Sequence, residues 1–309
     1  MGFLKNGSWV DRWYDTKSHK GEFLREDSVF RKWITKKGGA HQAESNRYHL
    51  YISLACPWAH RTIIYRTIKN LKNIISVSIV NPFMLENGWT FKPYPGSTVD
   101  HLYDSKYLYE LYLRANKNYS GRVTVPILWD KKLETIVNNE SSEIIRMFNS
   151  EFNQITNNFD DYYPDSRRKE IDELNHFTYH NINNAVYKAG FASSKEAYED
   201  AYENLFKALD KLEQILESRK YLLGEEITET DWRVFPTLIR FDAIYYSHFK
   251  CNKKRIIDYP NLHRLIKDLY NFKSVKETVD TDQSKIHYFG SHKLLNPSGI
   301  IPKGPKSLF

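Results

Sequence analysis

The chain has 309 residues, of which 41% are hydrophobic and 27% are charged, a balance that excludes a disordered polyelectrolyte and predicts a folded protein. Its length predicts two domains, each large enough for a hydrophobic core. The net charge of +7 comes from basic residues mixed with acidic ones along the whole chain, and no motif that reads bases accompanies them. We therefore expect no nucleic-acid partner.

The cysteines and the termini restrict where the protein works. Two cysteines, Cys56 and Cys251, are too few for a disulfide framework, and the first residues contain no apolar stretch of a secretory signal. No run of roughly 18 apolar residues is present to span a bilayer. The sequence predicts a cytoplasmic protein with no membrane partner. A mitochondrial address in the first residues stays open, although the acids Asp11, Asp15 and Glu22 oppose it.

The first half of the chain alternates between strand and helix patterns. Residues 1–47 are polar with scattered aromatic side chains and predict an extension that packs on the rest of the protein. Residues 49–54 predict a buried strand, residues 58–71 an amphipathic helix and residues 74–80 a second strand. These elements begin a domain that we place at 48–152.

The same domain continues after a long interruption. Residues 82–121 are rich in Gly, Pro, Asn and Tyr, and predict an insertion that contains some helix and contacts substrate. Residues 122–129 and 133–137 predict two strands, the first interrupted by Pro126, and a helix with a Ser capping contact begins at Glu140. The resulting order, β, α, β, insertion, β, β, α, is that of a thioredoxin-like domain.

The second half predicts an all-helical domain at 165–309. Helical spacing of apolar residues covers 167–187, 194–219, 231–249 and 261–270. Thr228 and Asp231 have the spacing of a capping box, which predicts that a helix begins there. The last thirty residues, including 287–289, have no clear period and predict an ordered tail. The expected fold class is therefore α/β plus all-α.

Cys56 has the placement of a nucleophile. It follows a predicted strand and precedes a helix that starts with Pro57, where backbone N–H groups and the helix dipole stabilise a thiolate. The position of a second redox cysteine, 59, is occupied by alanine, so Cys56 needs an external thiol to resolve a disulfide. The alternative is a buried, inert cysteine.

Two further loops are predicted beside Cys56 at one end of the sheet. A cis peptide at Val125–Pro126 would present backbone groups to a thiol ligand, whereas the alternative is an edge-strand proline. The Ser141 hydroxyl and the helix start after Glu140 suit a carboxylate, and Glu140 suits an ammonium group. Glutathione has all of these groups.

Several segments resemble one family along almost the whole chain. Residues 51–62, Tyr-Ile-Ser-Leu-Ala-Cys-Pro-Trp-Ala-His-Arg-Thr, are similar to the active-site segment of the glutathionyl-hydroquinone reductases, also called Xi-class glutathione transferases and related to the omega class. The resemblance covers about residues 7 to 305 and includes the segments at 81–84, 87–89, 137–143, 230–233, 240–242, 248–251, 286–288 and 296–300. It implies a thioredoxin-like N-terminal domain followed by the helical C-terminal domain of the glutathione transferases.

The resemblance also implies a reaction. Cys56 attacks the sulfur of a glutathionyl-hydroquinone, which gives a mixed disulfide with glutathione and a hydroquinone, and a second glutathione then releases oxidised glutathione. Tyr187 is the implied proton donor, while Tyr245 and Tyr288 donate hydrogen bonds to the thiolate. Tyr246 adjoins Tyr245, so either one is a candidate. The implied contacts with glutathione come from Trp89, Arg122, Val123, Thr124, Val125, Pro126, Glu140 and Ser141.

Other interpretations stay open. An omega-like thioltransferase or dehydroascorbate reductase would use the same Cys56, and a ligand-binding module with the same fold would not need it. The 11 histidines show no metal-ligand spacing, and we expect no metal. His60 and Cys251 are expected to be packing residues. The expected partners are glutathione, aromatic glutathionyl conjugates and a second copy of the chain, since the family suggests a homodimer.

Overall fold

A four-stranded sheet forms the centre of the first half of the protein. In the computed structural model, which describes residues 2–305, the strands are β3 (Tyr48–Ile52), β4 (Ile75–Ile79), β6 (Ile127–Asp130) and β7 (Thr135–Asn138). Their order is β4-β3-β6-β7, with β3 and β4 parallel and the other pairs antiparallel. This topology confirms the predicted thioredoxin-like domain.

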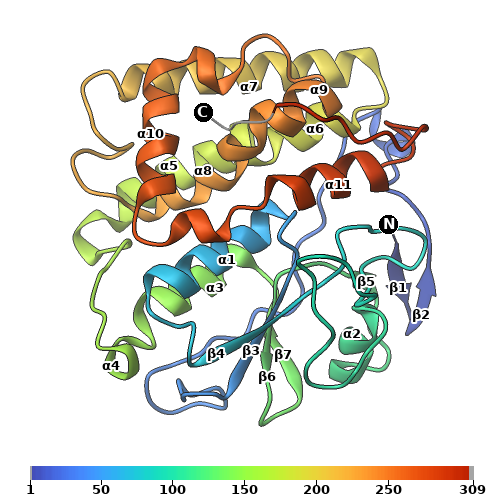
Figure 1. The fold of residues 1–309 in the computed structure, drawn as a ribbon, viewed down its shortest axis with the longest axis vertical. Coiled ribbons are helices and arrows are strands. Elements are labelled where there is room, and N and C mark those ends of the chain that lie inside the picture. Colours follow the sequence, from blue (N-terminus) through green and yellow to red (C-terminus); the bar gives the residue numbers. More distant parts are fainter. Residues whose placement is uncertain (1, 306–309) are drawn as a thin grey trace. The chain divides into compact units, whose positions relative to one another are not determined.

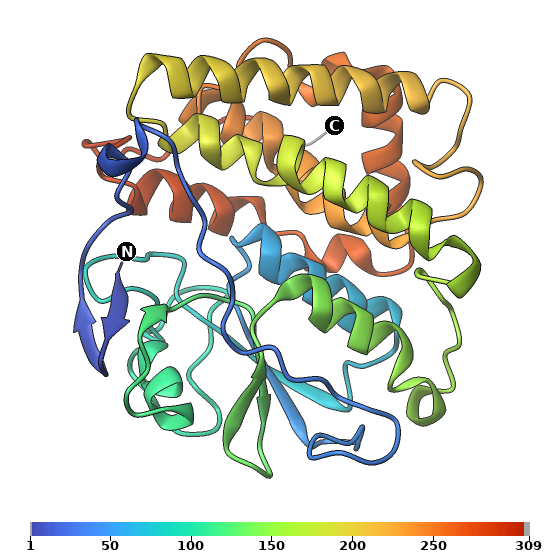
Figure 2. The same cartoon turned by 180° about the vertical axis from the view of Figure 1, so that it is seen from behind.

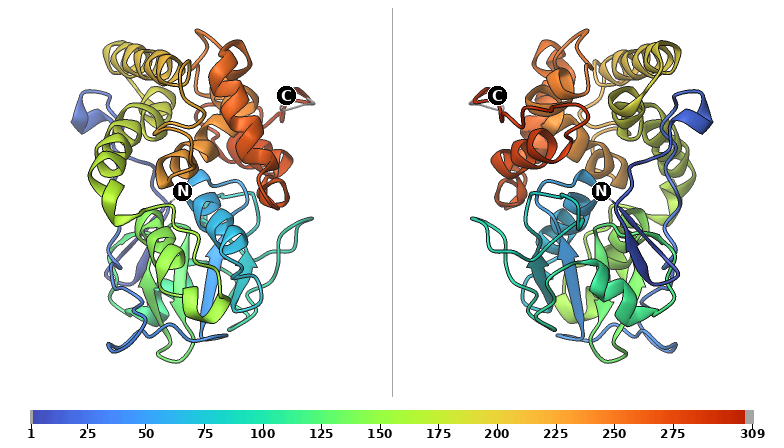
Figure 3. Two further views of the ribbon diagram at one scale, coloured as in Figure 1. Left: turned by 90° about the vertical axis from the view of Figure 1, so that its left-hand side faces the viewer. Right: turned by 90° about the vertical axis from the view of Figure 1, so that its right-hand side faces the viewer.

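The two helices that follow strands of this sheet pack against each other. They are α1 (Pro57–Ile68) and α3 (Ser141–Ser150), which lie side by side in Figure 3. Ile64 and Ile68 of α1 and Ile144 and Phe148 of α3 are fully buried, which places the core between these helices and the sheet. Burying a large apolar side chain contributes about 1.5–3 kcal/mol. The core therefore holds both helices on the sheet, with Cys56 directly before α1 and Ser141 at the start of α3.

A second, smaller sheet was not predicted. Strands β1 (Phe3–Lys5) and β2 (Ser8–Val10) of the N-terminal extension form antiparallel pairs, and β1 also pairs with β5 (Gly121–Arg122) at the end of the insertion. Strands of two or three residues are too short to show an alternating pattern. The insertion itself contains one helix, α2 (Tyr109–Ala115), as expected.

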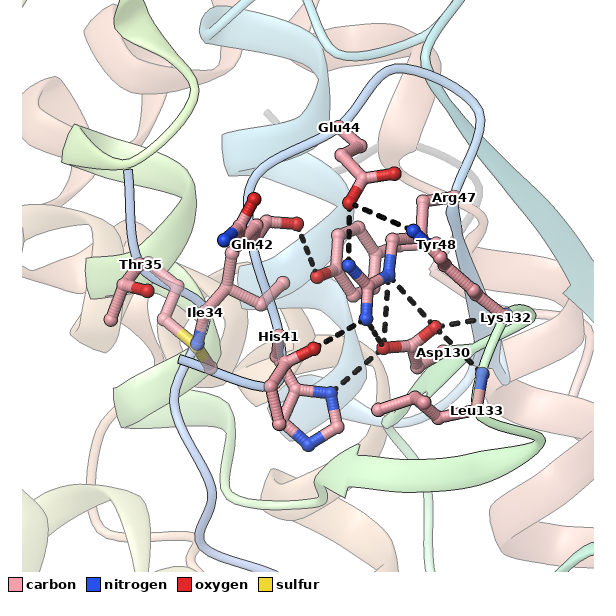
Figure 4. Close-up of polar contacts among 12 residues, drawn as sticks. Ile34, Thr35, His41, Gln42, Glu44, Arg47, Tyr48, Asp130, Lys132 and Leu133 are labelled. Carbon is pink, nitrogen blue, oxygen red and sulfur yellow. Dashed lines mark hydrogen bonds and ion pairs between the residues drawn. The ribbon is translucent and has the colours of Figure 1, made fainter. Parts of the chain in front are cut away.

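The rest of the extension is fixed to the sheet by buried charges. Residues 26–47 run as an extended segment along β7 and α3 (Figure 2), where the Lys32 N–H donates to the Val137 carbonyl at 3.0 Å. At its end Arg47 donates to the Asp130 carboxylate, with Nη2 2.6 Å from Oδ2, and His41 Nδ1 lies 2.8 Å from the same oxygen (Figure 4). Burial would raise the pKa of Asp130, but the hydrogen bonds from Arg47 and His41 lower it.

The C-terminal tail contains a helix where none was predicted. α11 (Thr281–Ser291) includes the segment 287–289, which we had expected to be part of an ordered tail. The polar residues Gln283, Ser284, Lys285 and His287 are buried together with Tyr288 and Phe289. Because polar side chains occupy buried positions, the apolar period that identifies a helix is absent from this segment.

The chain forms two compact units whose boundaries differ from the predicted domains. Unit 1 contains residues 2–13, Glu26–Asp161 and Glu277–Ser291, and unit 2 contains Tyr14–Arg25, Tyr162–Lys276 and residues 292–305. Most of the extension and all of α11 thus lie with the sheet. Short elements of unit 1 are α4 (Asn153–Thr156) and part of a 3-10 turn at Val275–Thr278.

Unit 2 is helical, as predicted. Its α-helices are α5 (Arg168–Thr178), α6 (Ala185–Phe191), α7 (Lys195–Ile215), α8 (Glu229–Arg240), α9 (Tyr246–His248) and α10 (Pro260–Asn271), with α10 crossing α7 in Figure 1. π-Helical turns occupy Tyr179–Asn183 and Phe241–Tyr245, and 3-10 turns occupy Lys17–His19, Asp165–Arg167 and Ile256–Asp258. The predicted capping box of Thr228 and Asp231 is present. Within residues 2–305, no helix has the length and apolar character to cross a membrane.

Candidate active site

Cys56 is the residue that caps α1. Its backbone is extended, with φ −79° and ψ 120°, and its carbonyl accepts the first hydrogen bond of the helix from the His60 N–H at 2.9 Å. Pro57 occupies the first position of the helix, as predicted. The half-buried Cys56 Sγ lies 3.7 Å from the Val125 carbonyl, to which the thiol donates. The thiol is thus placed between a helix start and the neighbouring loop.

The Val125–Pro126 peptide is cis, as the sequence predicted for this loop. The preceding residue is fixed by Tyr112, whose hydroxyl donates to the Thr124 carbonyl at 2.9 Å and accepts from the Thr124 N–H at 3.2 Å. Burial raises the pKa of Tyr112, so the phenol keeps the proton that it donates. Val123 and Val125 are buried beside it. The loop therefore has a fixed backbone next to Cys56.

The start of α3 differs from the prediction in one detail. We expected a serine to cap this helix, but the N-cap residue is Glu140, whose Oε1 accepts from the Ser142 N–H at 2.9 Å and from the Ser142 hydroxyl at 2.8 Å. A carboxylate accepts two hydrogen bonds at once and also suits the positive end of the helix dipole, which explains why it replaces the serine. Ser28 of the extension donates to the other oxygen of Glu140 at 3.3 Å.

Ser141 lies beside a buried cation that sequence reasoning missed. Arg61, which is 1% exposed, donates from Nη1 to the Ser141 hydroxyl at 3.5 Å, and its guanidinium lies 4.7 Å from the centre of the Trp58 ring. Trp58, Arg61 and Cys56 come from one short segment. The helix carries several polar and basic residues, so no signal in the sequence singled out Arg61 as the buried one. The positive charge favours an anionic ligand at this position.

Arg122 faces the N-terminal extension. Its Nη1 donates to the Arg12 carbonyl at 2.9 Å, its Nε lies 3.4 Å from Glu26 Oε1, and the guanidinium is 5.3 Å from the centre of the Phe3 ring. The structure therefore assigns this side chain a contact that the sequence did not indicate. Its predicted contact with glutathione stays a prediction.

Trp89 is buried within unit 1. Its indole ring stacks on the imidazole of His287, with the ring centres 4.7 Å apart and the planes inclined by 22°. The Trp89 carbonyl accepts from the Leu108 N–H at 2.9 Å. His287 lies on α11, almost 200 positions along the chain, so no local pattern could have linked the two residues.

Of the three predicted tyrosines, one lies in unit 1 and two lie together in unit 2. Tyr288 is buried on α11 next to His287, whose ring centre is 5.1 Å away. The rings of Tyr187 and Tyr245 are 6.1 Å apart, and Phe249 contacts both, at 5.5 Å and 5.4 Å. Tyr245 is fully buried in this cluster, and the choice between Tyr245 and its neighbour Tyr246 stays open. The approach of Tyr187 and Tyr245 to Cys56 stays a prediction.

Arg25 is a second residue that sequence reasoning missed. Its guanidinium lies 4.9 Å from the centre of the Tyr187 ring, and its Nε donates to the Asn184 side chain at 3.0 Å. A cation over an aromatic ring is stabilised by the ring quadrupole. Arg25 comes from the extension, so the sequence gave no reason to place it in the helical unit.

A cavity of about 740 Å³ lies in the insertion, apart from the predicted site. Its walls include Phe83, Phe91, Tyr94 and Tyr107, and none of the residues predicted for catalysis or glutathione binding lines it. We therefore place the candidate active site at Cys56 on the basis of the thiol and the groups around it.

Cys251 and His60, which we expected to be packing residues, are both buried. Cys251 is buried, and burial raises the pKa of its thiol, which suits the predicted packing role and not a nucleophile. His60 is also buried, with Nε2 2.8 Å from the Thr278 hydroxyl. Among residues 2–305, no group of three or more His, Cys, Asp or Glu side chains has a metal-binding arrangement.

The arrangement in unit 1 supports thiol chemistry on a peptide-like ligand. A thiol lies at a helix start, a fixed loop offers backbone groups beside it, and a second helix start with Ser141 and Arg61 nearby suits a carboxylate. Nothing in this arrangement resolves a disulfide from within, because position 59 is an alanine.

Comparison with known proteins agrees with this arrangement. Residues 55–151 match the family model of the glutathione S-transferase N-terminal domain, and residues 195–268 match that of the C-terminal domain. The chain is 55% identical to the glutathionyl-hydroquinone reductase YqjG of Escherichia coli, over 99% of this chain and 95% of the relative.

Solved structures extend the similarity to the fold. The glutathione-bound structure of YqjG from Escherichia coli K-12 matches with a TM-score of 0.88 and 53% identity, over 91% of this chain and 96% of that one. The Xi glutathione S-transferase of Phanerochaete chrysosporium matches with a TM-score of 0.90 and 48% identity, over 93% and 98% of the two chains.

Proposed function

The chain belongs to the Xi-class glutathione transferases, the family of the glutathionyl-hydroquinone reductases, and we propose that it reduces glutathionyl-hydroquinones with glutathione as co-substrate. The observation that carries the proposal is Cys56 at the start of α1, with its thiol beside the Val125 carbonyl and no second cysteine at position 59. A thiol in this position forms a mixed disulfide that only an external thiol can resolve.

The proposed reaction has two steps. The Cys56 thiolate attacks the sulfur that joins glutathione to the aromatic ring, so that an S–S bond forms and the C–S bond breaks. The electron pair of the broken bond stays on the ring carbon, which takes up a proton and leaves as the hydroquinone. A second glutathione then attacks the mixed disulfide, releases oxidised glutathione and returns the thiolate, and its proton is released.

The groups near Cys56 are assigned to the glutathione part of the substrate. The Val125 backbone pairs with the peptide, and Ser141 at the start of α3 binds a carboxylate with the Arg61 charge beside it. Glu140 pairs with the ammonium group, a role that its capping bonds to Ser142 leave open because a carboxylate accepts more than two hydrogen bonds. Trp89 covers the tripeptide.

The tyrosines are assigned to the aromatic part. Tyr187 donates the proton to the ring carbon of the substrate, and Arg25 lies over the phenol ring of Tyr187. Tyr245 and Tyr288 donate hydrogen bonds to the Cys56 thiolate. A positioned proton donor contributes roughly 100-fold or more to the rate. We also propose that the protein works in the cytoplasm, as a homodimer, on aromatic glutathionyl conjugates.

The experiment that tests the proposal follows both products. Purified protein is mixed with glutathionyl-menadiol and glutathione, and the release of menadiol and of oxidised glutathione is measured beside Cys56→Ser and Cys251→Ser variants. We expect equal amounts of the two products, no turnover with Cys56→Ser and full turnover with Cys251→Ser. Release of oxidised glutathione only from a small disulfide substrate would assign the protein to the thioltransferases. Glutathione binding without either reaction would indicate a ligand-binding module.

A further inference from the structure

Helix α11 contacts the insertion at three separate points of its backbone. His287 donates from Nδ1 to the Pro82 carbonyl at 3.0 Å, Ser291 accepts from the Met84 N–H at 3.0 Å, and Gln283 donates to the Pro95 carbonyl at 2.9 Å. The partners are between 188 and 207 positions apart in the chain. In Figure 1 these segments are the red helix and the teal loops of unit 1. A helix from the end of the chain thus fixes the insertion.

His287 is the residue of α11 whose ring also meets Trp89. The stack of its imidazole on the indole is close to parallel, and both side chains are buried. The bond from Nδ1 to Pro82 fixes the rotation of the imidazole, because turning the ring would break it. The same hydrogen bond therefore sets the direction of the ring face on which Trp89 lies.

The surrounding packing leaves the helix little freedom to shift. A Cβ atom on Gly290 would lie 2.5 Å from a carbon of the Phe83 ring, so helix and insertion approach closely where no side chain separates them. Within the insertion, the backbone around Trp89 is held by two further hydrogen bonds. The Leu108 N–H donates to the Trp89 carbonyl, and the Asn81 N–H donates to the Thr90 carbonyl. Trp89 is fixed by its backbone and by the ring of His287.

We propose that His287 is a positioning residue that holds Trp89 in its glutathione-covering orientation before the ligand binds. The inference rests on the proposed function, in which Trp89 covers the tripeptide. A side chain that is ordered beforehand does not lose rotational freedom when the ligand arrives, which strengthens binding without any contact between His287 and glutathione. His287 then affects the affinity for glutathionyl substrates and not the breaking of the C–S bond.

The first measurement needs no substrate. Hydrogen exchange of the Asn81, Gly88 and Leu108 amides, all hydrogen-bonded within the insertion, is compared between the wild type and His287→Ala. We expect exchange that is roughly 3- to 10-fold faster at these amides, the range that loss of one aromatic stack gives. Asp282→Asn, an exposed change on the same helix, is the matched control and should leave them unchanged. Equal exchange in His287→Ala and the wild type would overturn the proposal.

The second measurement separates positioning from chemistry. His287→Ala should raise KM for glutathionyl-menadiol roughly 3- to 10-fold with kcat unchanged, and His287→Phe, which keeps a flat ring, should recover part of the loss. In a Trp89→Ala background His287→Ala should have no further effect, because the residue through which it acts is gone. Additive effects of the two changes, or a fall in kcat alone, would overturn the proposal.

The outcomes distinguish this inference from the proposed function. If the wild type releases no hydroquinone, the reductase assignment fails, and glutathione binding by calorimetry replaces KM in the same double-mutant comparison. If Trp89→Ala leaves the affinity for glutathione unchanged, Trp89 does not cover the tripeptide. The positioning role of His287 is then wrong, even if His287→Ala speeds hydrogen exchange in the insertion. Faster exchange throughout unit 1 in His287→Ala, without selectivity for the insertion, would also overturn the proposal.

Discussion

The turn that bears Cys56 and the insertion that bears Trp89 are ordered by different means. The turn is defined by neighbours in the sequence, since Cys56 caps its own helix and bonds to Ser53 and His60. The insertion has bonds of its own but is also held by α11, whose bonds to it join residues about 200 positions apart. A local arrangement depends on single hydrogen bonds of small value, whereas a distant one depends on buried groups with several partners. We therefore expect substitutions in buried distant contacts to cost more stability than substitutions in local ones.

The largest effect is expected from the buried charges that fix the extension to the sheet. Asp130→Asn removes the partner of the buried Arg47 and should lower the free energy of unfolding by about 3–5 kcal/mol. Lys72→Gln breaks the exposed pair of Lys72 and Glu277, 2.8 Å apart, and should cost less than about 1 kcal/mol. Urea unfolding of both variants tests the difference. Both pairs join distant parts of the chain, so equal losses would show that burial of the charges does not matter here.

Because the folded-state pKa of Asp130 is lowered, its contribution to stability has a defined pH range. The contribution is fully present above the unfolded pKa of about 4 and is lost as the pH falls through the folded value. The difference in stability between wild type and Asp130→Asn should therefore be constant from pH 5 to 8 and shrink only in stronger acid.

The two cysteines show what the local turn contributes. At pH 8 iodoacetamide should modify Cys56 at least ~100-fold faster than Cys251, because Cys56 is half-buried at a helix start whereas burial raises the pKa of the Cys251 thiol. Mass spectrometry of peptides after timed quenching measures both rates in one sample. Comparable rates would mean that the helix start gives Cys56 no special reactivity.

An effect of intermediate size is expected at His49, which joins neighbouring strands. Its nitrogens lie 2.7 Å and 2.9 Å from the hydroxyls of Ser76 and Ser78, and burial lowers the pKa of His49 to about 3. The unfolded chain then takes up a proton that the folded chain does not, so stability falls as the pH falls below about 6.5. The loss between pH 7 and pH 5 should be about 2 kcal/mol larger in the wild type than in His49→Gln, measured by chemical unfolding at each pH. Parallel pH profiles would contradict this expectation.

The smallest effect is expected at a local cap. Glu140→Ala removes the acceptor for the Ser142 N–H at the start of α3 and should cost about 1 kcal/mol. Glu140→Gln keeps an acceptor and should recover most of it. Thermal unfolding measures the stability, and glutathione affinity of the same variants tests the proposed ammonium contact. A cap that costs as much as Asp130→Asn would erase the distinction between local and distant contacts.

The same distinction explains what the sequence could predict. Strands β3 and β4, the helix start at Cys56 and the capping box of Thr228 and Asp231 follow from neighbouring residues, and all are confirmed. The start of α3 at Glu140 is also confirmed. The helix is capped by Glu140 itself, however, and not by the serine that we expected. The predicted order of elements along the domain, β, α, β, insertion, β, β, α, is confirmed as well.

Most of the features that escaped prediction depend on residues far apart in the chain. Strands β1 and β2 are three residues long, and β1 also pairs with β5, more than a hundred positions later. α11 buries Gln283, Lys285 and His287, of which Gln283 and His287 bond to the insertion, so polar residues stand where a periodic pattern needs apolar ones. Arg25 meets the Tyr187 ring only in the folded chain, whereas Arg61 lies beside Trp58 on the same helix and its burial alone escaped prediction.

The assignment of α11 to unit 1 has a consequence for synthesis on the ribosome. Most of the unit, through Asp161, is made well before its last helix, which ends at Ser291. At ~5–20 residues per second the intervening segment takes roughly 6–26 seconds to make. During that interval the nascent insertion lacks its helical support, so a chaperone that binds unpaired apolar loops has its opportunity then, and a fragment that stops at residue 161 stays in that state permanently.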